Sequence, residues 1–276
     1  MSKHKLTLNQ IEVLSHLFSS KVISQLAKGE HLNFLAKFLK EAKLTKSHIK
    51  VFETLGSFFN IIFEALSNSK YRNEYIYKSA IIHKRLLGVH SLRTTTLLNE
   101  FRAGASKADV VVLNGTSTVY EIKSERDSLA RLSSQLADYQ KVFTHINVIT
   151  SEEQVASILK ATPKHIGVLC LTNRYHISTI REASECCEFL NSVSMFNSLR
   201  RDEAQDILRN IGLSLPNVPN TLIHQKLSEL FEKLEPNLVH DEMIKVLKTT
   251  RSQIELKDFI DTMPKSLQAI VFFKSF

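Results

Sequence analysis

The sequence has few residues that break regular secondary structure or cross-link a chain. Among its 276 residues there are seven glycines, five prolines and three cysteines, and tryptophan is absent. Because glycine and proline punctuate turns, their scarcity favours helices over an all-β fold rich in turns. Hydrophobic residues make up 43% of the chain, which is enough to bury a sizeable core in one large domain or two small ones.

The cysteines argue against stabilisation of the fold by disulfide bonds or by a zinc site. Cys170, Cys186 and Cys187 have the spacing of neither a disulfide framework nor a zinc site, and adjacent cysteines do not readily bind one ion together. We therefore expect reduced cysteines in a cytoplasmic protein. The first residues lack the apolar core of a signal peptide, and the longest apolar stretch, near 58–66, is too short to span a bilayer, so we expect no membrane partner.

Positive charge exceeds negative charge. The formal net charge is +8 and the pI is about 9.3. A basic surface attracts polyanions, of which nucleic acid is the commonest. Many basic proteins bind none, so charge alone leaves open both a nucleic-acid partner and a generic solvated surface.

Helical periodicity marks both ends of the chain. Apolar residues recur at helical spacing from Leu8 to Phe18, and the C-terminal part shows the same texture. We predict a helical N-terminal region at 1–90, an α/β core at 91–180 and a helical C-terminal region at 181–276. The flanks contain no constellation of acids and bases, so we expect them to shape substrate access or to mediate self-association as a homo-oligomer.

The middle of the chain predicts a β-hairpin. We expect a helix over 91–101 and a turn at 104–107, followed by a strand at 108–113, whose β-branched residues favour an extended backbone. Asn114-Gly115 is a strong hairpin-turn dipeptide. The run 118–123 should therefore form a second strand, antiparallel to the first.

Helices and strands alternate beyond the hairpin. A helix follows, then strands at 145–150 and 166–171, with a short fifth strand at 174–177. The fourth strand is nearly all apolar, as expected for a central position that is buried on both faces. These elements predict an α/β fold with a mixed sheet and helices on both faces.

Two acids and a lysine would meet at one end of the hairpin. Asp109 begins the first strand and Glu121 lies late in the second, so antiparallel pairing brings the two carboxylates together. Lys123 projects from the same sheet face as Glu121, because strand side chains alternate. The two carboxylates and the main-chain carbonyl of Ile122 offer the oxygen ligands that a hard divalent cation such as Mg²⁺ or Mn²⁺ prefers.

This group of residues suits phosphodiester hydrolysis. A bound metal lowers the pKa of its water and neutralises the charge that builds on the phosphate. A lysine can orient or deprotonate the attacking water. A second interpretation stays open because so short a motif often occurs by chance: Asp109 would then be a strand-edge residue, and Glu121 with Lys123 a solvated surface pair.

Neighbouring residues extend the pattern into a known one. Glu100 lies nine residues before Asp109 on the expected helix, and Gln135 and Tyr139 share one face of the following helix. Together with Glu121-Ile122-Lys123, they resemble the PD-(D/E)xK nuclease superfamily. The QxxxY spacing is similar to that of its RecB-like branch. The resemblance is confined to the α/β core, and the flanks add nothing to it.

The resemblance implies a restriction-endonuclease-like core and a metal-dependent nuclease. Asp109 and Glu121 would be metal ligands and Lys123 the catalytic lysine, and Glu100 would bind the metal directly or through water. Ala108 stands where the motif's name has proline, at a position that varies in the superfamily. Some RecB-like members hold an iron–sulfur cluster with four cysteines, which this chain lacks.

The resemblance also implies a nucleic-acid substrate, with DNA favoured over RNA. Gln135 and Tyr139 would position the site and contact the nucleic-acid backbone, although Tyr139 also fits the apolar face of its helix. Arg131 could touch phosphates or simply face solvent. By analogy the role is defence against foreign DNA or nucleic-acid processing. The alternative is a catalytically silent nuclease-fold protein that binds nucleic acid or a protein partner.

Overall fold

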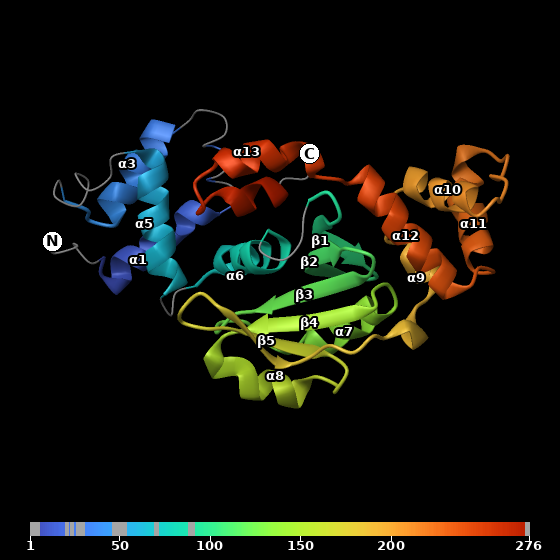
Figure 1. Ribbon diagram of the computed structural model, residues 1–276, viewed down its shortest axis with the longest axis horizontal. Coiled ribbons are helices and arrows are strands. Elements are labelled where there is room, and N and C mark those ends of the chain that lie inside the picture. Colours follow the sequence, from blue (N-terminus) through green and yellow to red (C-terminus); the bar gives the residue numbers. More distant parts are fainter. Residues whose placement is uncertain are drawn as a thin grey trace.

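A six-stranded mixed sheet forms the centre of the computed structural model, which describes residues 6–19, 22, 25, 31–45, 54–68, 72–87 and 92–273 (Figure 1). The strands follow one another in space in chain order. They are β1 (Thr96–Ala103), β2 (Ser106–Leu113), β3 (Ser117–Lys123), β4 (His145–Thr150), β5 (Gly167–Leu171) and β6 (Ile177–Arg181). Strands β3, β4 and β5 pair in parallel, and the other neighbours are antiparallel. The expected α/β class with a mixed sheet is confirmed.

The predicted hairpin is present. Strands β2 and β3 pair antiparallel, with Val110 opposite Tyr120 and Leu113 opposite Ser117. Gly115 in the connecting turn has φ of +108°, a backbone conformation that residues other than glycine rarely adopt. The Asn114-Gly115 dipeptide therefore sets the register that brings the far ends of the two strands together.

The helix expected over 91–101 is wrong. Ser91 lies outside the described residues, and Thr96–Ala103 is the edge strand β1, with Leu97 opposite Val112. Adjacent leucines fit a helix equally well, and pairing with the apolar strand β2 decides the outcome. The short strand expected at 174–177 also lies later in the chain, as β6 at Ile177–Arg181.

Helices of the N-terminal region cover one face of the sheet (Figure 1). Helix α6 lies closest and is buried from Tyr75 to Ile81, so it acts as a central helix of this half. It packs with Val110, Ile122 and Ile149 of the sheet in one hydrophobic core. The elements of this region are α1 (Leu8–Ser15), a 3-10 turn η1 (His16–Phe18), α3 (His31–Glu41), α5 (Leu55–Ser67), α6 (Glu74–Ile81) and a π-helical segment η2 (Ile82–Leu86).

The opposite face carries a second hydrophobic core. Val111 and Val119 of the hairpin pack there with Leu136 and Tyr139 of α7. This side comprises α7 (Leu132–Gln140), α8 (Val155–Ala161) after the 3-10 turn η3 (Glu152–Gln154), the 3-10 turn η4 (Cys187–Phe189), α9 (Ser192–Phe196), α10 (Arg201–Asn210), α11 (Asn220–Phe231) and α12 (Pro236–Thr250). Helices therefore lie on both faces of the sheet, as expected.

The end of the chain returns to the first core. The 3-10 turn η5 (Ile254–Leu256), α13 (Lys257–Thr262) and the 3-10 segment η6 (Gln268–Phe272) pack beside the N-terminal helices. The Tyr75 hydroxyl donates to the Ser266 carbonyl at 2.6 Å across this contact. The C-terminal region thus contributes to both faces. In the described part of the chain, no helix is long and apolar enough to cross a membrane.

One polar contact joins C-terminal helices to each other, and a second joins this region to the sheet. The Arg251 guanidinium donates to both carboxylate oxygens of Glu203 at 2.7 Å, and Glu203 is almost wholly buried. The Gln253 side-chain amide bonds the main chain of Leu97 on edge strand β1: its oxygen accepts from the Leu97 N–H at 3.1 Å and its nitrogen donates to the Leu97 carbonyl at 2.8 Å.

Candidate active site

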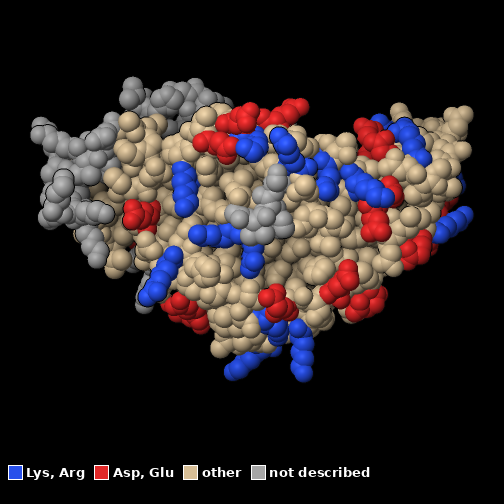
Figure 2. Space-filling view, in the orientation of Figure 1, with Lys and Arg blue, Asp and Glu red and all other residues tan. Residues whose placement is uncertain are grey.

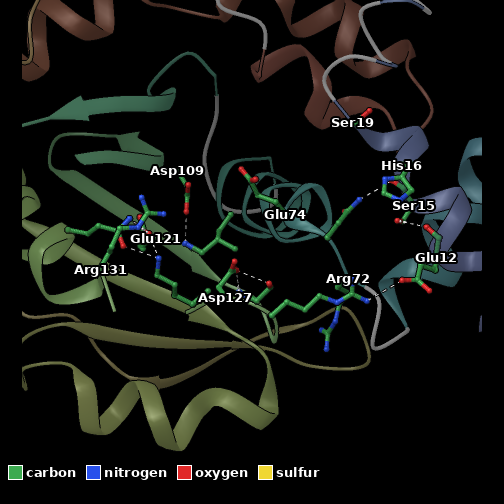
Figure 3. Close-up of a pocket in the computed structure, with 16 residues that line it drawn as sticks. Glu12, Ser15, His16, Ser19, Arg72, Glu74, Asp109, Glu121, Asp127 and Arg131 are labelled. Carbon is green, nitrogen blue, oxygen red and sulfur yellow. Dashed lines mark hydrogen bonds and ion pairs between the residues drawn. The ribbon is translucent and has the colours of Figure 1, made fainter. Parts of the chain in front are cut away.

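A cavity of about 540 Å³ opens between the hairpin, the start of α7 and the N-terminal helices (Figure 3). Both predicted acids and the predicted lysine line it. In Figure 3, Asp109 and Glu121 lie on one side, and Glu12, Ser15, His16 and Ser19 on the other. The remaining lining residues are Arg72, Asn73, Glu74, Ile122, Lys123, Ser124, Arg126, Asp127, Arg131 and Gln135.

Glu121 and Lys123 form a buried ion pair on β3. Strand alternation turns both side chains toward α7, while Tyr120 and Ile122 face the first core. The Lys123 ammonium lies 2.8 Å from Glu121 Oε1. Lys123 is only 7% exposed and Glu121 only 2%. The pair is therefore not the solvated surface pair that the sequence left open.

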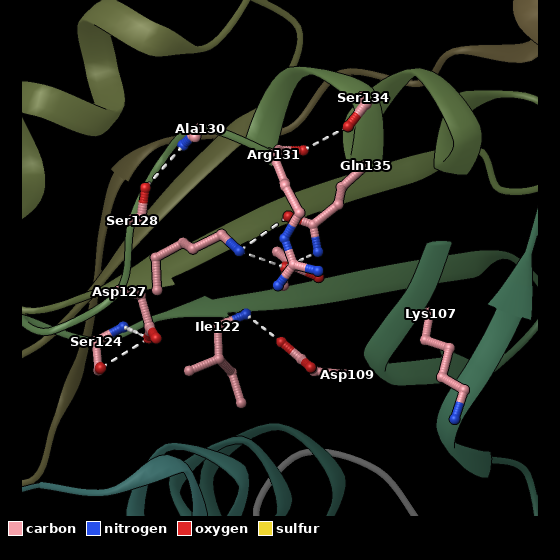
Figure 4. Close-up of polar contacts among 12 residues, drawn as sticks. Lys107, Asp109, Ile122, Ser124, Asp127, Ser128, Ala130, Arg131, Ser134 and Gln135 are labelled. Atoms are coloured by element: carbon pink, nitrogen blue, oxygen red, sulfur yellow. Dashed lines mark hydrogen bonds and ion pairs between the residues drawn. The ribbon is translucent and has the colours of Figure 1, made fainter. Parts of the chain in front are cut away.

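Gln135 connects both members of this pair. Its side-chain oxygen accepts from the Lys123 ammonium at 2.9 Å, and its nitrogen donates to Glu121 Oε1 at 2.7 Å (Figure 4). Gln135 comes from the first turns of α7 (Leu132–Gln140), so the helix holds the strand residues in place. The QxxxY glutamine thus lies against the predicted acid and lysine, and its contact with nucleic acid stays a prediction.

Tyr139 holds the other oxygen of Glu121. Its hydroxyl lies 2.7 Å from Glu121 Oε2 and 2.7 Å from the main-chain carbonyl of Lys107. Burial, followed by the negative charge of Glu121, raises the pKa of Tyr139 far above its usual range, so this hydroxyl keeps its proton as a donor. The expected apolar packing of Tyr139 is present, because its ring fills the second core, and a contact with nucleic acid stays a prediction.

Asp109 lies at a break in the sheet, opposite a residue with a strained backbone. The β1–β2 ladder pairs Asn99 with Val110 but omits the step at Glu100, whose φ of +50° is left-handed. There the Asp109 carboxylate accepts from the Ile122 N–H at 2.7 Å. Burial and then the negative charge of Glu121 raise the pKa of Asp109 to about 7, against the opposing effect of that N–H.

The donor set suits a hard cation. A carboxylate has about four acceptor positions, and protein donors occupy one on Asp109 and three on Glu121. Within the described residues, no three histidine, cysteine, aspartate or glutamate side chains form a group that could hold a metal ion. Mg²⁺ commonly uses one or two carboxylates and completes its shell with water and substrate phosphate, so these two acids fit it.

Glu100 is not brought to the cavity that Asp109 lines. It lies on a strand, not a helix, and its half-exposed carboxylate faces Lys107 at 3.6 Å and Lys78 at 4.0 Å. Glu74 of α6 lines the Asp109 cavity instead and adds to the rise in the pKa of Asp109. Glu74 is itself paired with Lys78 at 2.7 Å. The structure therefore places the Glu100 carboxylate away from the other predicted metal ligands.

Two arginines stand at the rim. Arg131 is exposed, lines the cavity, and its side chain lies beside Gln135 in Figure 4. Arg126 is also exposed and faces Glu12 of α1 at 3.9 Å. Arg72 is different, since it is buried and donates to the Leu171 carbonyl. Arg131 is therefore placed where the sequence expected a phosphate contact.

No sequence pattern near the motif indicates the opposite wall of the cavity. Ser15, His16 and Ser19 come from the first helices, about ninety residues and more before the motif. Asn73 joins this wall to α6, because its side-chain amide donates to the Ser15 carbonyl at 3.0 Å. No local pattern predicts contacts between segments so far apart, and only the fold brings them together.

Comparison with known proteins assigns a family. A sequence profile of bacteriophage P4 protein cII matches residues 67–269, which is more than half of the chain. The chain belongs to the bacteriophage P4 protein cII family. The part shared with the P4 cII family contains Asp109, Glu121, Lys123 and the α7 residues, while α1 and its wall of the cavity precede it.

Two individual proteins are similar to the chain. Protein cII of Enterobacteria phage P4 is 24% identical over 196 residues, covering 69% of this chain and 68% of that protein. A solved structure of a protein of unknown function from Silicibacter pomeroyi is 20% identical and gives a TM-score of 0.30, covering 44% of this chain and 82% of the other. That TM-score is too low to bear on the fold of the P4 cII family.

Proposed function

We propose that this protein is a divalent-metal-dependent nuclease of the PD-(D/E)xK type, which hydrolyses phosphodiester bonds of DNA in preference to RNA. One observation carries the proposal. Asp109, Glu121 and Lys123 line a single cavity, and the QxxxY residues Gln135 and Tyr139 both hold Glu121. All five belong to the motif, and a chance match would not be expected to bring both Gln135 and Tyr139 onto Glu121.

Asp109, Glu121 and the carbonyl of Ile122 would hold Mg²⁺ or Mn²⁺. The bound ion would supply an activated water and offset charge on the phosphate. The raised pKa of Asp109 supports this assignment, because it reflects negative charge in a buried place with too few compensating groups. Gln135 and Tyr139 orient Glu121, as outer partners of metal ligands commonly do.

Lys123 would act on the reacting phosphate or on its attacking water. Its ammonium is fixed by Glu121 and Gln135, so its charge is in place before substrate enters. A positioned charge in a site that excludes water stabilises a transition state more than the same charge in solvent. Arg131 at the rim would contact a flanking phosphate.

A second candidate function is binding without cleavage. It is favoured by the contacts of the Lys123 ammonium, which already satisfies Glu121 and Gln135 and so could serve stability alone. The biological setting that we propose, nucleic-acid processing or defence against foreign DNA, follows only from the nuclease.

The deciding experiment incubates the purified protein with end-labelled DNA and RNA, each single- and double-stranded, with Mg²⁺, Mn²⁺ or a chelator. We expect cleavage that requires the metal and is lost in Lys123→Met. Glu100→Gln is the matched control, since that acid lies outside the cavity and should leave cleavage unchanged. Binding without cleavage under either metal would favour the second candidate.

A further inference from the structure

The catalytic group lies at the bottom of the cavity rather than on an open surface. Glu121 is 2% exposed, and its partners Lys123 and Tyr139 are also buried. A phosphodiester must therefore enter the cavity to reach these side chains. At about 540 Å³, the cavity falls in the range of small-ligand pockets, about 300–1,000 Å³, which suits a nucleotide-sized segment of chain.

The wall opposite the acids is built into the core. Ser15 and His16 face the cavity, while Leu14 and Leu17 beside them are fully buried. Phe18 stacks on Tyr75 of α6 with ring centroids 5.0 Å apart. The amide of Asn73 adds the bond to the Ser15 carbonyl. Moving this wall aside would break a packed aromatic contact, so the cavity keeps its second side when substrate binds.

A duplex fits such a site poorly. Double-stranded DNA stays stiff over about 50 nm, so its backbone cannot bend locally into a recess with two fixed sides without a large deformation. A single strand bends freely, and its phosphates can enter the cavity one at a time. The depth of Glu121 and the fixed position of Ser15 therefore select for flexible substrate.

The lining indicates what part of that strand is read. Among the described lining residues there is no phenylalanine or tyrosine, and His16 supplies the one aromatic ring, so these residues offer little surface for stacking bases. Charged groups that suit phosphates, Arg126 and Arg131, stand at the rim. On the face shown in Figure 2, basic and acidic side chains are interspersed rather than gathered into one basic surface. Recognition would thus be local to the cavity and directed at the sugar–phosphate backbone.

We propose that the site takes single-stranded nucleic acid, or single-stranded stretches at ends and gaps, and reads its backbone with little preference among bases. This inference rests on the proposed nuclease function for the chemistry, and on the cavity walls for the substrate. It predicts that a single strand is cleaved about tenfold or more faster than the same sequence in a blunt duplex. This factor corresponds to a modest difference in binding free energy between the two substrates.

The first measurement compares cleavage of three DNA substrates of one sequence by the full chain in Mn²⁺: a single strand, a blunt duplex and a duplex with an internal gap. We expect the order single strand, then gapped duplex with cuts confined to the gap, then blunt duplex. Equal rates on single strand and blunt duplex would overturn the inference while leaving the nuclease intact.

The second measurement does not depend on cleavage. Fluorescence anisotropy with the Lys123→Met protein should show single strand bound about tenfold more tightly than duplex, with little difference among base compositions. Ser15→Phe and, separately, Ser19→Phe place a bulky ring in the cavity and should abolish that preference. Ser157→Phe, at an exposed position of α8 outside the cavity, should keep it.

Thermal melts show whether Ser15→Phe and Ser19→Phe are folded. One folded variant of the two is enough to test the single-strand preference. If wild type cuts nothing but the single-strand preference is present and is lost in the Ser15 or Ser19 variant, the nuclease fails and the inferred substrate stands. If both folded variants keep the preference, or if duplex binds as tightly as single strand, the inference is wrong.

Discussion

The Lys123 ammonium lies 2.8 Å from the Glu121 carboxylate, two residues earlier on the same strand and almost out of contact with solvent. Such a pair is tolerated in a protein interior only when further hydrogen bonds satisfy both charges. Gln135 supplies a bond to each member, and Tyr139 supplies another to Glu121. The proposed chemistry and the stability of this region therefore depend on the same four side chains.

Replacing Lys123 with methionine should separate catalysis from binding. Lys123→Met keeps the aliphatic stem and removes the charge, so single-turnover cleavage should fall by about 10²–10⁴-fold, as for loss of a positioned general acid–base group. Nucleic-acid affinity by anisotropy should change little, because it is spread over many basic side chains. Lys107→Met is the matched control, since that lysine is exposed and outside the cavity. Unchanged cleavage in both Lys123→Met and Lys123→Ala would show that Lys123 is not catalytic.

Asp109 should make metal binding depend on pH. Its pKa of about 7 without metal means that protons and Mn²⁺ compete for it near neutrality. The apparent Mn²⁺ affinity, measured by calorimetry, should rise between pH 6 and pH 8 in wild type and in Glu100→Gln. Asp109→Asn should lose the binding. Equal binding by Asp109→Asn and wild type would remove this residue from the site.

The same carboxyl should lower the stability of the metal-free protein at high pH. Its folded-state pKa is raised above the ordinary value of 3.8, so the stability that it contributes is fully present below about pH 3.8 and is lost as pH rises through 7. Asp109→Asn, which cannot ionise, should therefore melt at a higher temperature than wild type at pH 8, and the difference should shrink toward pH 4. A difference independent of pH would contradict the raised pKa.

Tyr139→Phe should weaken the site without emptying its core. The ring stays in place, but the hydroxyl that contacts Glu121 and the Lys107 carbonyl is lost. We expect about 1 kcal/mol less stability by chemical denaturation and a fall of about 10–100-fold in Mn²⁺ affinity or cleavage, as for other outer partners of metal ligands. Tyr120→Phe, on the same strand as Glu121 but facing the other core, should leave the Mn²⁺ affinity unchanged.

The buried pair of Glu203 and Arg251 should matter for stability alone. Arg251→Met leaves Glu203 unpaired and should cost about 3 kcal/mol, the low end for buried pairs because the arginine side chain is 20% exposed. Burial acts to raise the pKa of Glu203, but bonds from Arg251 and the Arg200 N–H outweigh it and lower the pKa below 4.5. The stabilisation is present above pH 4.5 and is lost as pH falls through the lowered value. Melts of wild type and Arg251→Met should therefore converge in acid.

The local part of the fold and of the site could be predicted from the sequence. The hairpin was predicted correctly, because Asn114-Gly115 and the two β-branched runs are short-range signals that agree with each other. Strand alternation placed Glu121 and Lys123 on one face, and the resemblance to the nuclease superfamily added Gln135 to them. These features depend on residues that lie within about twenty positions of one another in the chain.

The predictions that failed concern features that depend on contacts between residues far apart in the sequence. Thr96–Ala103 forms a strand because β2 pairs with it, and its leucines alone do not distinguish strand from helix. That error placed Glu100 on a helix, and the metal-binding role that the resemblance implied for its carboxylate finds no support in its position outside the cavity. The wall formed by Ser15, His16 and Ser19 was missed because the contacts of this segment with the start of α6 have no signature in the sequence near the motif.

The amide of Gln253 occupies the outer edge of strand β1 at Leu97, where it takes both main-chain bonds that a further strand would make. An uncovered strand edge is a template on which another chain can polymerise. Cutting the chain after α12 would strip this cover from the sheet, so the shortened protein should form aggregates that add strand to strand. We therefore expect the C-terminal segment to protect the sheet edge at Leu97, and the α/β core to need that segment when it is produced without the other helices.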